Sequence, residues 1–258
     1  MVQNNKLVPL SAVRPGDIIL CRSDGGKLSR KITAATRSEY SHAAICIGEN
    51  LAAESIFWPG VAKVELTVLV GRYNYVAILR HPKDVWTDRR INELRKFIDK
   101  KTLFPFRALY NLFGLFGFDR RKERHELTVL EKLKNFFEGT GSPRNPEKKT
   151  YFCSELVCSC YNAVGIFQPS AAVAYDPLTI APGDLGKDPS FGYFFGYCSA
   201  RNDCRIPGDD EFYDAPTKRN IRQGSITSGL RRTRDVPLTH SVSQPGMGQS
   251  CLTNNRPK

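Results

Sequence analysis

The sequence predicts one domain of mixed helices and β-strands, and three observations support this class. Short segments rich in small, β-branched and apolar residues are typical of strands, and they occur at 41–48, 51–57, 61–68 and 73–79. Apolar residues recur at helical spacing after Cys153, which predicts a buried helix there. A length of 258 residues with 41% hydrophobic content is enough to bury one substantial core.

Further elements follow from local signals along the chain. The sequence Arg14-Pro-Gly-Asp17 predicts a turn that leads into a short apolar strand. A helix is expected at about 27–36, and a charged amphipathic helix at 86–100. Beyond the cysteine helix, 176–185 predicts a turn with a 3₁₀ segment, and 191–197 predicts a last strand.

Changes in composition set the expected domain boundaries. The domain is expected to span 10–200, with an insertion at 102–149 that a minimal domain of this kind would not need. Beyond residue 201 the sequence loses its periodicity and becomes rich in Gly, Pro, Ser, Thr, Asn and Arg. We therefore expect 202–258 to form a disordered tail.

The composition also excludes several classes of protein. No continuous apolar run precedes residue 14, so no signal peptide is expected, and the most apolar window, 103–118, is too short to span a bilayer. Eight cysteines without a secretory signal or metal-ligand spacing predict reduced thiols, with no disulfide, metal or cofactor. The expected location is the cytoplasm or the periphery of a membrane.

The formal charge of +12 bears on the choice of partner. The basic excess lies mainly outside the cysteine helix, and such asymmetry suits an anionic membrane surface or a polyanion. A solvated basic face is the alternative explanation. Nucleic-acid binding is not expected, because no recognised nucleic-acid-binding module accompanies the charge.

The hairpin predicted at 41–57 brings a histidine close to a carboxylate. If Gly48-Glu-Asn50 forms the loop, Ile47 opposes Leu51 and Ala44 opposes Glu54, so that His42 lies diagonally from Glu54 on the same face. A two-residue loop would send the two side chains to opposite faces. Taken singly, each residue has a structural explanation: a core histidine, or a charge at a strand edge.

Cys153 is expected in the first turn of its helix, after an extended segment at 150–152. Unpaired backbone N–H groups and the positive end of the helix dipole favour the thiolate there, and the thiolate is the reactive form of cysteine. A buried and inert thiol is the alternative.

Together these residues supply a nucleophile, a base and an orienting group. His42 would take the proton of Cys153 and later protonate the leaving group, while Glu54 would hold the second nitrogen of the imidazole. The backbone N–H of Cys153 would serve as an oxyanion donor, with the Tyr151 hydroxyl as a possible second donor.

At these residues the sequence resembles the circularly permuted NlpC-type papain-like hydrolases, particularly the YiiX and YaeF-like branch. The resemblance covers about 10–200 and rests on Arg14-Pro-Gly-Asp-Ile-Ile19, Ser41-His-Ala-Ala-Ile45, Ala53-Glu-Ser55, Tyr151-Phe-Cys-Ser-Glu-Leu-Val157 and Ile180-Ala-Pro-Gly-Asp-Leu185. The histidine precedes the cysteine, as in the permuted group. The resemblance implies an α+β fold with an antiparallel sheet packed on the cysteine helix, and acyl transfer through a thioester.

The residues leave the substrate open, because the same chemistry serves amide, ester and thioester bonds. The first hypothesis is a thiol-dependent hydrolase or transferase that cleaves amide bonds in peptides or acylated amines. The second is a lipid-acyl hydrolase or acyltransferase at a membrane, and the third is an inactive binding module with the same fold. The lipid hypothesis draws on 100–122, where basic residues bracket an aromatic run in which Pro105 would open a helix. Packing of that run in the core, or as a lid, is the alternative.

Overall fold

The computed structural model describes most of the predicted domain. The described residues are 6–22, 25–36, 38–56, 60–102, 109–110, 150–169, 171, 175, 177–201 and 203–215. Its helices are η1 (Leu10–Ala12), α1 (Lys27–Thr36), α2 (Leu66–Gly71), α3 (Asp88–Thr102), α5 (Cys153–Ala163), η4 (Pro177–Thr179), α7 (Pro182–Lys187) and η5 (Pro189–Phe191). Its strands are β1 (Ile18–Arg22), β2 (Tyr40–Gly48), β3 (Leu51–Ser55), β4 (Val61–Glu65), β5 (Val76–Arg80), β6 (Leu109–Tyr110), β7 (Thr150–Tyr151) and β8 (Tyr193–Cys198).

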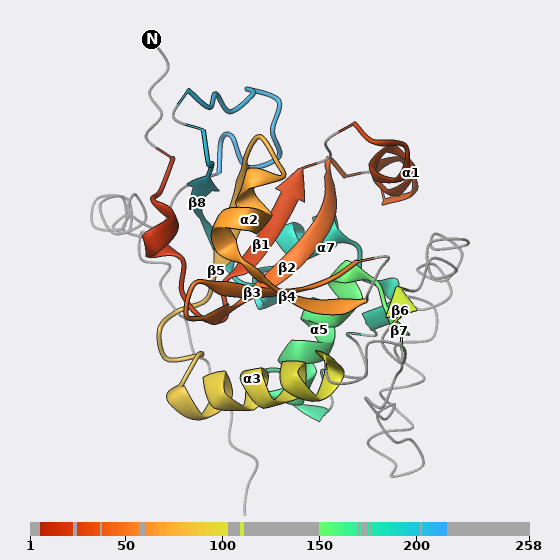
Figure 1. Cartoon of the computed structure of the whole chain (residues 1–258), viewed down its shortest axis with the longest axis vertical. Coiled ribbons are helices and arrows are strands. Elements are labelled where there is room, and N and C mark those ends of the chain that lie inside the picture. Colours follow the sequence, from red (N-terminus) through yellow and green to blue (C-terminus); the bar gives the residue numbers. More distant parts are fainter. Residues whose placement is uncertain are drawn as a thin grey trace, which may run out of the picture.

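The fold is α+β and is built on a six-stranded sheet in the order β4-β3-β2-β1-β5-β8. All neighbouring strands in this sheet are antiparallel. Helices α3 and α5 contact each other and lie below the sheet in Figure 1. Helix α5 also packs directly on β2 and β3, which brings its first residues to the strands of the predicted hairpin.

Apolar clusters cover both faces of the sheet, which explains why β1, β2 and β5 are buried along nearly their whole length. One cluster joins the sheet to α5 and α3 and includes Ile45, Leu94 and Leu156. The other lies beneath α2 and includes Ala44 and Leu69. The strand that carries His42 is therefore held from both sides.

One predicted strand is wrong at its end. Residues 66–68 belong to helix α2, whereas the sequence placed them in a strand spanning 61–68. Leu66, Leu69 and Val70 are buried, and their three- and four-residue spacing is that of one helix face. The apolar, β-branched composition of this segment suits a strand locally, but packing of this face on the sheet favours the helix.

The hairpin between β2 and β3 has the predicted register at Ala44 and Glu54, but its loop differs from the predicted one. Glu49 and Asn50 have φ angles of 56° and 60°, so the loop holds two residues in the left-handed conformation that tight hairpins need. Gly48, not Ile47, opposes Leu51, and the register shifts between Cys46 and Gly48. A two-residue loop without a bulge would shift the pairing by one residue and exchange the faces on which the side chains lie. The bulge cancels this shift, so Ala44 opposes Glu54 as expected.

The predicted insertion lies mostly outside the described residues. Within it, Leu109–Tyr110 form strand β6, which pairs in parallel with β7 directly before Cys153. A helix through the aromatic run therefore does not include these two residues. The rest of the lid or membrane-docking segment, 103–108 and 111–149, lies outside the described chain.

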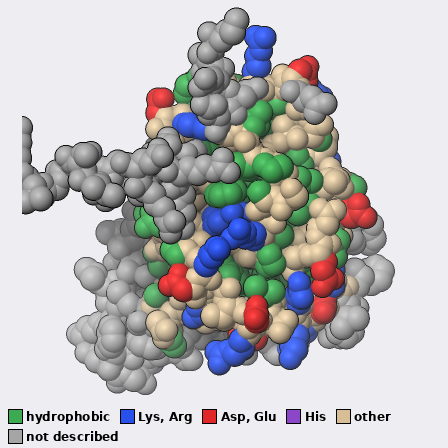
Figure 2. Space-filling view, turned by 90° about the vertical axis from the view of Figure 1, so that its left-hand side faces the viewer, with side chains coloured by type: hydrophobic (Ala, Val, Ile, Leu, Met, Phe, Trp, Pro, Cys, Tyr) green, Lys and Arg blue, Asp and Glu red, His purple; other side chains and the backbone are tan. Residues whose placement is uncertain are grey.

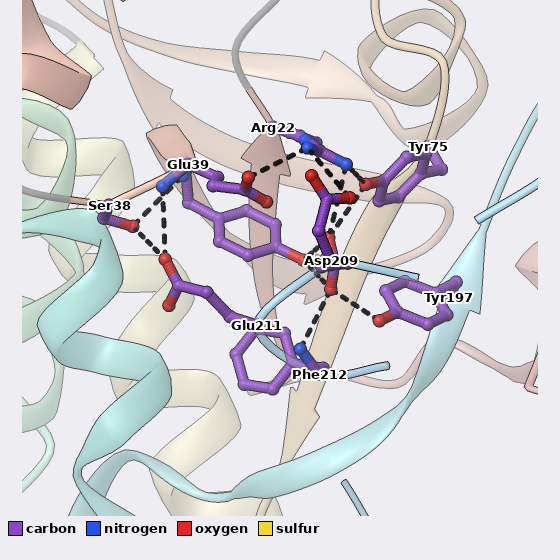
Figure 3. A network of polar contacts seen from close by, with 10 residues as sticks. Arg22, Ser38, Glu39, Tyr75, Tyr197, Asp209, Glu211 and Phe212 are labelled. Carbon is purple, nitrogen blue, oxygen red and sulfur yellow. Dashed lines mark hydrogen bonds and ion pairs between the residues drawn. The ribbon is translucent and has the colours of Figure 1, made fainter. Parts of the chain in front are cut away.

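The packed chain continues past the predicted start of the tail at residue 202. Asp210 is buried and its carboxylate accepts hydrogen bonds from the hydroxyls of Tyr40, Tyr75 and Tyr197 at 2.6–3.1 Å. Arg22 lies 3.9 Å from the same carboxylate (Figure 3). Segment 203–215 is therefore anchored to β1, β2, β8 and the residue before β5, because a buried carboxylate requires such donors. The remaining predicted tail, 216–258, lies outside the described residues.

Candidate active site

Cys153 is the first residue of helix α5, as the sequence predicts. Phe152 caps the helix in an extended conformation, and the Glu155 carboxylate accepts the backbone N–H of Phe152 at 3.2 Å. This is one half of a capping box, and it fixes the point where the helix begins. The thiol is only 1% exposed and lies where helix N–H groups have no intrahelical partner.

The pairing of β2 with β3 stops beside the thiol of Cys153. Pairing between β2 and β3 begins at Ala44 and Glu54, whereas β3 continues against β4 through Ser55. The Ser55 hydroxyl instead donates to the carbonyl oxygen of Tyr151 at 2.8 Å, which ties the segment before Cys153 to the end of β3. The backbone N–H of Ala43 donates to the sulfur of Cys153. Ala43 and Ser55 would be the next pair between β2 and β3, but their hydrogen bonds go to Cys153 and to the segment before it, and so position the nucleophile.

His42 connects the thiol to Glu54. Its imidazole is hydrogen-bonded to Cys153, and its Nε2 lies 2.9 Å from Glu54 Oε2. Because Nε2 is taken by the carboxylate, Nδ1 is the nitrogen left for the thiol. The structure thus brings together the three residues predicted as nucleophile, base and orienting group. All three are buried, with His42 9% and Glu54 1% exposed.

A fourth residue, Arg72, completes this chain of contacts. It follows helix α2, and its Nη1 donates to Glu54 Oε1 at 2.7 Å. Each oxygen of the Glu54 carboxylate therefore has its own partner, the imidazole on one side and the guanidinium on the other. Two such partners hold a buried carboxylate in one orientation and compensate its desolvation.

The electrostatics of the pair favour a thiolate and an imidazolium. Burial acts to lower the pKa of His42, but its hydrogen bonds to Cys153 and Glu54 outweigh burial and raise the pKa to about 9. Burial acts to raise the pKa of Cys153, yet the bond to His42 and the N–H groups of Ala43 and Ser154 bring it below its ordinary value. Both shifts favour the ion pair, in which the imidazole holds the proton and the sulfur is a thiolate.

The pKa of Glu54 is also shifted. Burial acts to raise it, but the hydrogen bonds from His42 and Arg72 outweigh burial and lower it. Glu54 is therefore ionised throughout the neutral range. An ionised carboxylate stabilises the imidazolium that forms when Cys153 gives up its proton.

Two further residues border the imidazole and were not found from the sequence. The ring of Tyr73 lies nearly parallel to that of His42, with an interplanar angle of 16° and centroids 6.4 Å apart. Cys21 lies opposite His42 on β1, and Tyr73 forms a hydrogen bond with its side chain. Burial raises the pKa of Cys21 well above its ordinary value, so this second thiol stays protonated beside the reactive one.

Arg72 lies in a connection that carries no periodic pattern, so the sequence does not indicate it. Tyr73 was expected to begin the strand at 73–79, but β5 begins only at Val76, which leaves Tyr73 in the connection. The one available signal is the spacing of Leu66, Leu69 and Val70. It identifies α2 and thereby places the next residues at the end of a helix packed on the sheet.

Tyr151, the predicted second oxyanion donor, is buried within the apolar cluster that joins the sheet to α5 and α3. Burial raises the pKa of its phenol, and Glu155 and Cys160 contribute in the same direction. Lys101 lies over its ring at 5.3 Å from the centroid. These contacts favour a packing role for the phenol between α3 and α5, while its carbonyl oxygen holds Ser55.

The other cysteines of the described chain provide a contrast to Cys153. Cys158 and Cys160, deeper in α5, are completely buried. Burial raises the pKa of Cys160, and it raises that of Cys46 to about 11. The seven cysteines within the described ranges are all free thiols. Among them, Cys153 combines a helix start with a histidine partner and a lowered pKa.

The described residues contain no group of three or more His, Cys, Asp or Glu side chains that could hold a metal ion. No family model matches the chain, and no curated protein matches it. The functional interpretation therefore depends on the geometry around Cys153.

Proposed function

We propose that this chain is a cysteine hydrolase or acyltransferase that works through a thioester on Cys153. The observation that supports it best is the hydrogen-bonded series Cys153, His42 and Glu54, buried at the start of α5. Such a series supplies a thiolate at neutral pH together with an acid for the leaving group. The fold we propose is the circularly permuted papain-like one, supported by the chain order and by α5 packing on β2 and β3.

The reaction follows from these positions. The thiolate of Cys153 attacks the carbonyl carbon of an amide, and the negative charge moves to the carbonyl oxygen. The carbon–nitrogen bond then breaks, and the amine leaves with the proton that His42 carries. The neutral imidazole removes a proton from water, which attacks the thioester and releases the acid and the thiolate. A different nucleophile in place of water would make the enzyme an acyltransferase.

The test is turnover of a panel of small substrates by the parent protein and by Cys153→Ser. The panel contains peptide amides, acylated amines, simple acyl esters and phospholipids. We expect an amide or acylated amine to be cleaved by the parent, with a mass increase on Cys153 equal to the acyl group. Equal turnover by Cys153→Ser would contradict the proposal. An inactive binding module would leave the whole panel unchanged and Cys153 unacylated.

A lipid-acyl hydrolase is the second candidate, and one observation favours it. Figure 2 shows a face of the described chain on which apolar side chains surround a group of Lys and Arg side chains. Among the described residues, the exposed large hydrophobic side chains include Val68 and Tyr193, which are 50% and 49% exposed. None of the described helices is both long and apolar enough to cross a membrane.

Co-sedimentation with anionic and neutral liposomes distinguishes this candidate. A lipid-acyl enzyme is expected to sediment with anionic vesicles at low salt and to release fatty acid from them, because surface cations near headgroups contribute about 1 kcal/mol each. The matched variant lacks 102–121. If the parent remains in the supernatant at low salt, the lipid candidate is excluded and the amide substrates remain.

A further inference from the structure

We propose that Arg72 is a positioning residue of this site: it fixes the Glu54 carboxylate toward His42 and balances its charge, so that the thiolate of Cys153 forms at neutral pH. This inference rests on the proposed function, because it assigns a role within the same thiol site.

The geometry singles out Arg72 among the basic residues of the described chain. Glu54 is 1% exposed, and the guanidinium of Arg72 occupies the oxygen that His42 does not use. The Arg72 side chain is 42% exposed, so it lies between the buried carboxylate and solvent. The salt bridge is therefore the last contact of the series that runs from Cys153 through His42 and Glu54.

The backbone of Arg72 is fixed by the core rather than by the ion pair. Its N–H donates to the carbonyl oxygens of Leu69 and Val70 at the end of α2. Both of these residues are buried in the cluster beneath α2. The guanidinium therefore starts from a rigid position, and the side chain loses less conformational entropy when it binds Glu54.

Charges alternate along the series in the reactive state. Cys153 is negative, His42 is positive, Glu54 is negative and Arg72 is positive, so the four groups together are neutral. Without Arg72, the three buried groups carry one uncompensated negative charge. A buried charge without a partner is costly, and the site would relieve the cost by keeping a proton on Cys153 or by taking one up on Glu54.

The other titratable groups around the thiol do not supply this balance. On β1, Cys21 is a neutral thiol at neutral pH, since burial raises its pKa well above the ordinary value. Ahead of β5, burial also raises the pKa of the Tyr73 phenol, which stays neutral as well. On α5 itself, Glu155 is bound to the N–H of Phe152 and is the same in every variant described below. Arg72 is thus the cation that partners Glu54 besides His42.

The experiment measures the rate of Cys153 alkylation by iodoacetamide from acid to alkaline pH, so that the midpoint of an ordinary thiol falls within the range, and the labelled site is identified by mass spectrometry. The midpoint of the rate profile reports formation of the thiolate. In Arg72→Met we expect the midpoint to rise by about one pH unit. This is the lower end of the range of about 1–3 units for an opposite charge in direct contact, because Arg72 contacts Glu54 and acts on the thiol through it. Arg72→Lys keeps the charge and one donor, so its midpoint should lie between those of the parent and Arg72→Met.

Lys63→Met is the matched control. Lys63 on β4 is 38% exposed and is paired with Asp99 of helix α3 rather than with Glu54, so this variant removes a similar surface cation that has no contact with the thiol series. Its midpoint should equal that of the parent. Circular dichroism verifies that each variant is folded.

The outcomes separate the two proposals. A parent midpoint below that of an ordinary thiol, together with unchanged midpoints in folded Arg72→Met and Arg72→Lys, would overturn the role of Arg72 alone. A parent midpoint at the value of an ordinary thiol would overturn the proposed function, and the role of Arg72 with it. If Arg72→Met fails to fold, the midpoint of Arg72→Lys decides: equality with the parent counts against the role.

Discussion

Replacement of Glu54 by glutamine tests how much the carboxylate contributes to the reactivity of Cys153. The amide keeps the size of the side chain but presents one acceptor to two donors, His42 Nε2 and Arg72 Nη1. A hydrogen bond to a charged group contributes about 1.5–3 kcal/mol, and about 1.4 kcal/mol corresponds to a factor of ten. Because an amide oxygen can still accept one bond, we expect the lower part of this range, a loss of about tenfold.

The assay is the second-order rate of Cys153 alkylation at neutral pH, measured for the parent, Glu54→Gln, Glu54→Ala and His42→Ala. Glu54→Ala removes both interactions and should approach a hundredfold loss, since about 3 kcal/mol corresponds to that factor. His42→Ala should reduce the rate the most and abolish turnover, because no base remains beside the thiol. A parent rate in folded Glu54→Ala would show that Glu54 is not the orienting group.

Three further predictions concern the surroundings of the site. Iodoacetamide at neutral pH should label Cys153 well before Cys158, which is completely buried, and equal labelling of both would contradict the assignment of the nucleophile. Tyr151→Phe should keep close to the parent turnover, whereas loss of a true oxyanion donor would reduce kcat by about 100-fold or more. Asp210→Ala should lower the free energy of unfolding by about 2–4 kcal/mol, because three buried phenols lose their acceptor. Asp209→Ala, at a side chain 75% exposed, should change it by less than about 0.5 kcal/mol, and equal Tm shifts in the two variants would refute the anchoring role of Asp210.

The sequence predicted the parts of the site that depend on local pattern. Cys153 at a helix start follows from apolar spacing after an extended segment, and α5 begins there. The pairing of Ala44 with Glu54 was correct, although the loop that produces it was not. Pattern alone does not reveal a bulge, because Ile47 is equally suited to a regular strand position and to an irregular one.

Other parts of the structure depend on contacts between distant residues, and the sequence could not supply them. Arg72 meets Glu54 only because α2 packs on the sheet, and this short helix was read as the end of a strand. Asp210 lies in a polar segment with no periodicity, and its burial depends on tyrosines from β2, from the residue before β5 and from β8. Such long-range satisfaction of a buried charge leaves no local signal.

The most direct test of the central claim is the titration of His42 itself, followed by NMR of protein with labelled histidine rings. The chain has four histidines, and the His42 signal is identified by its loss in His42→Ala. The thiolate–imidazolium pair predicts that His42 keeps its proton until about pH 9 in the parent. In Cys153→Ala the titration should move to lower pH, because the thiolate that stabilises the imidazolium is gone. Titration of His42 near its ordinary value of 6.5 in both proteins would contradict the account.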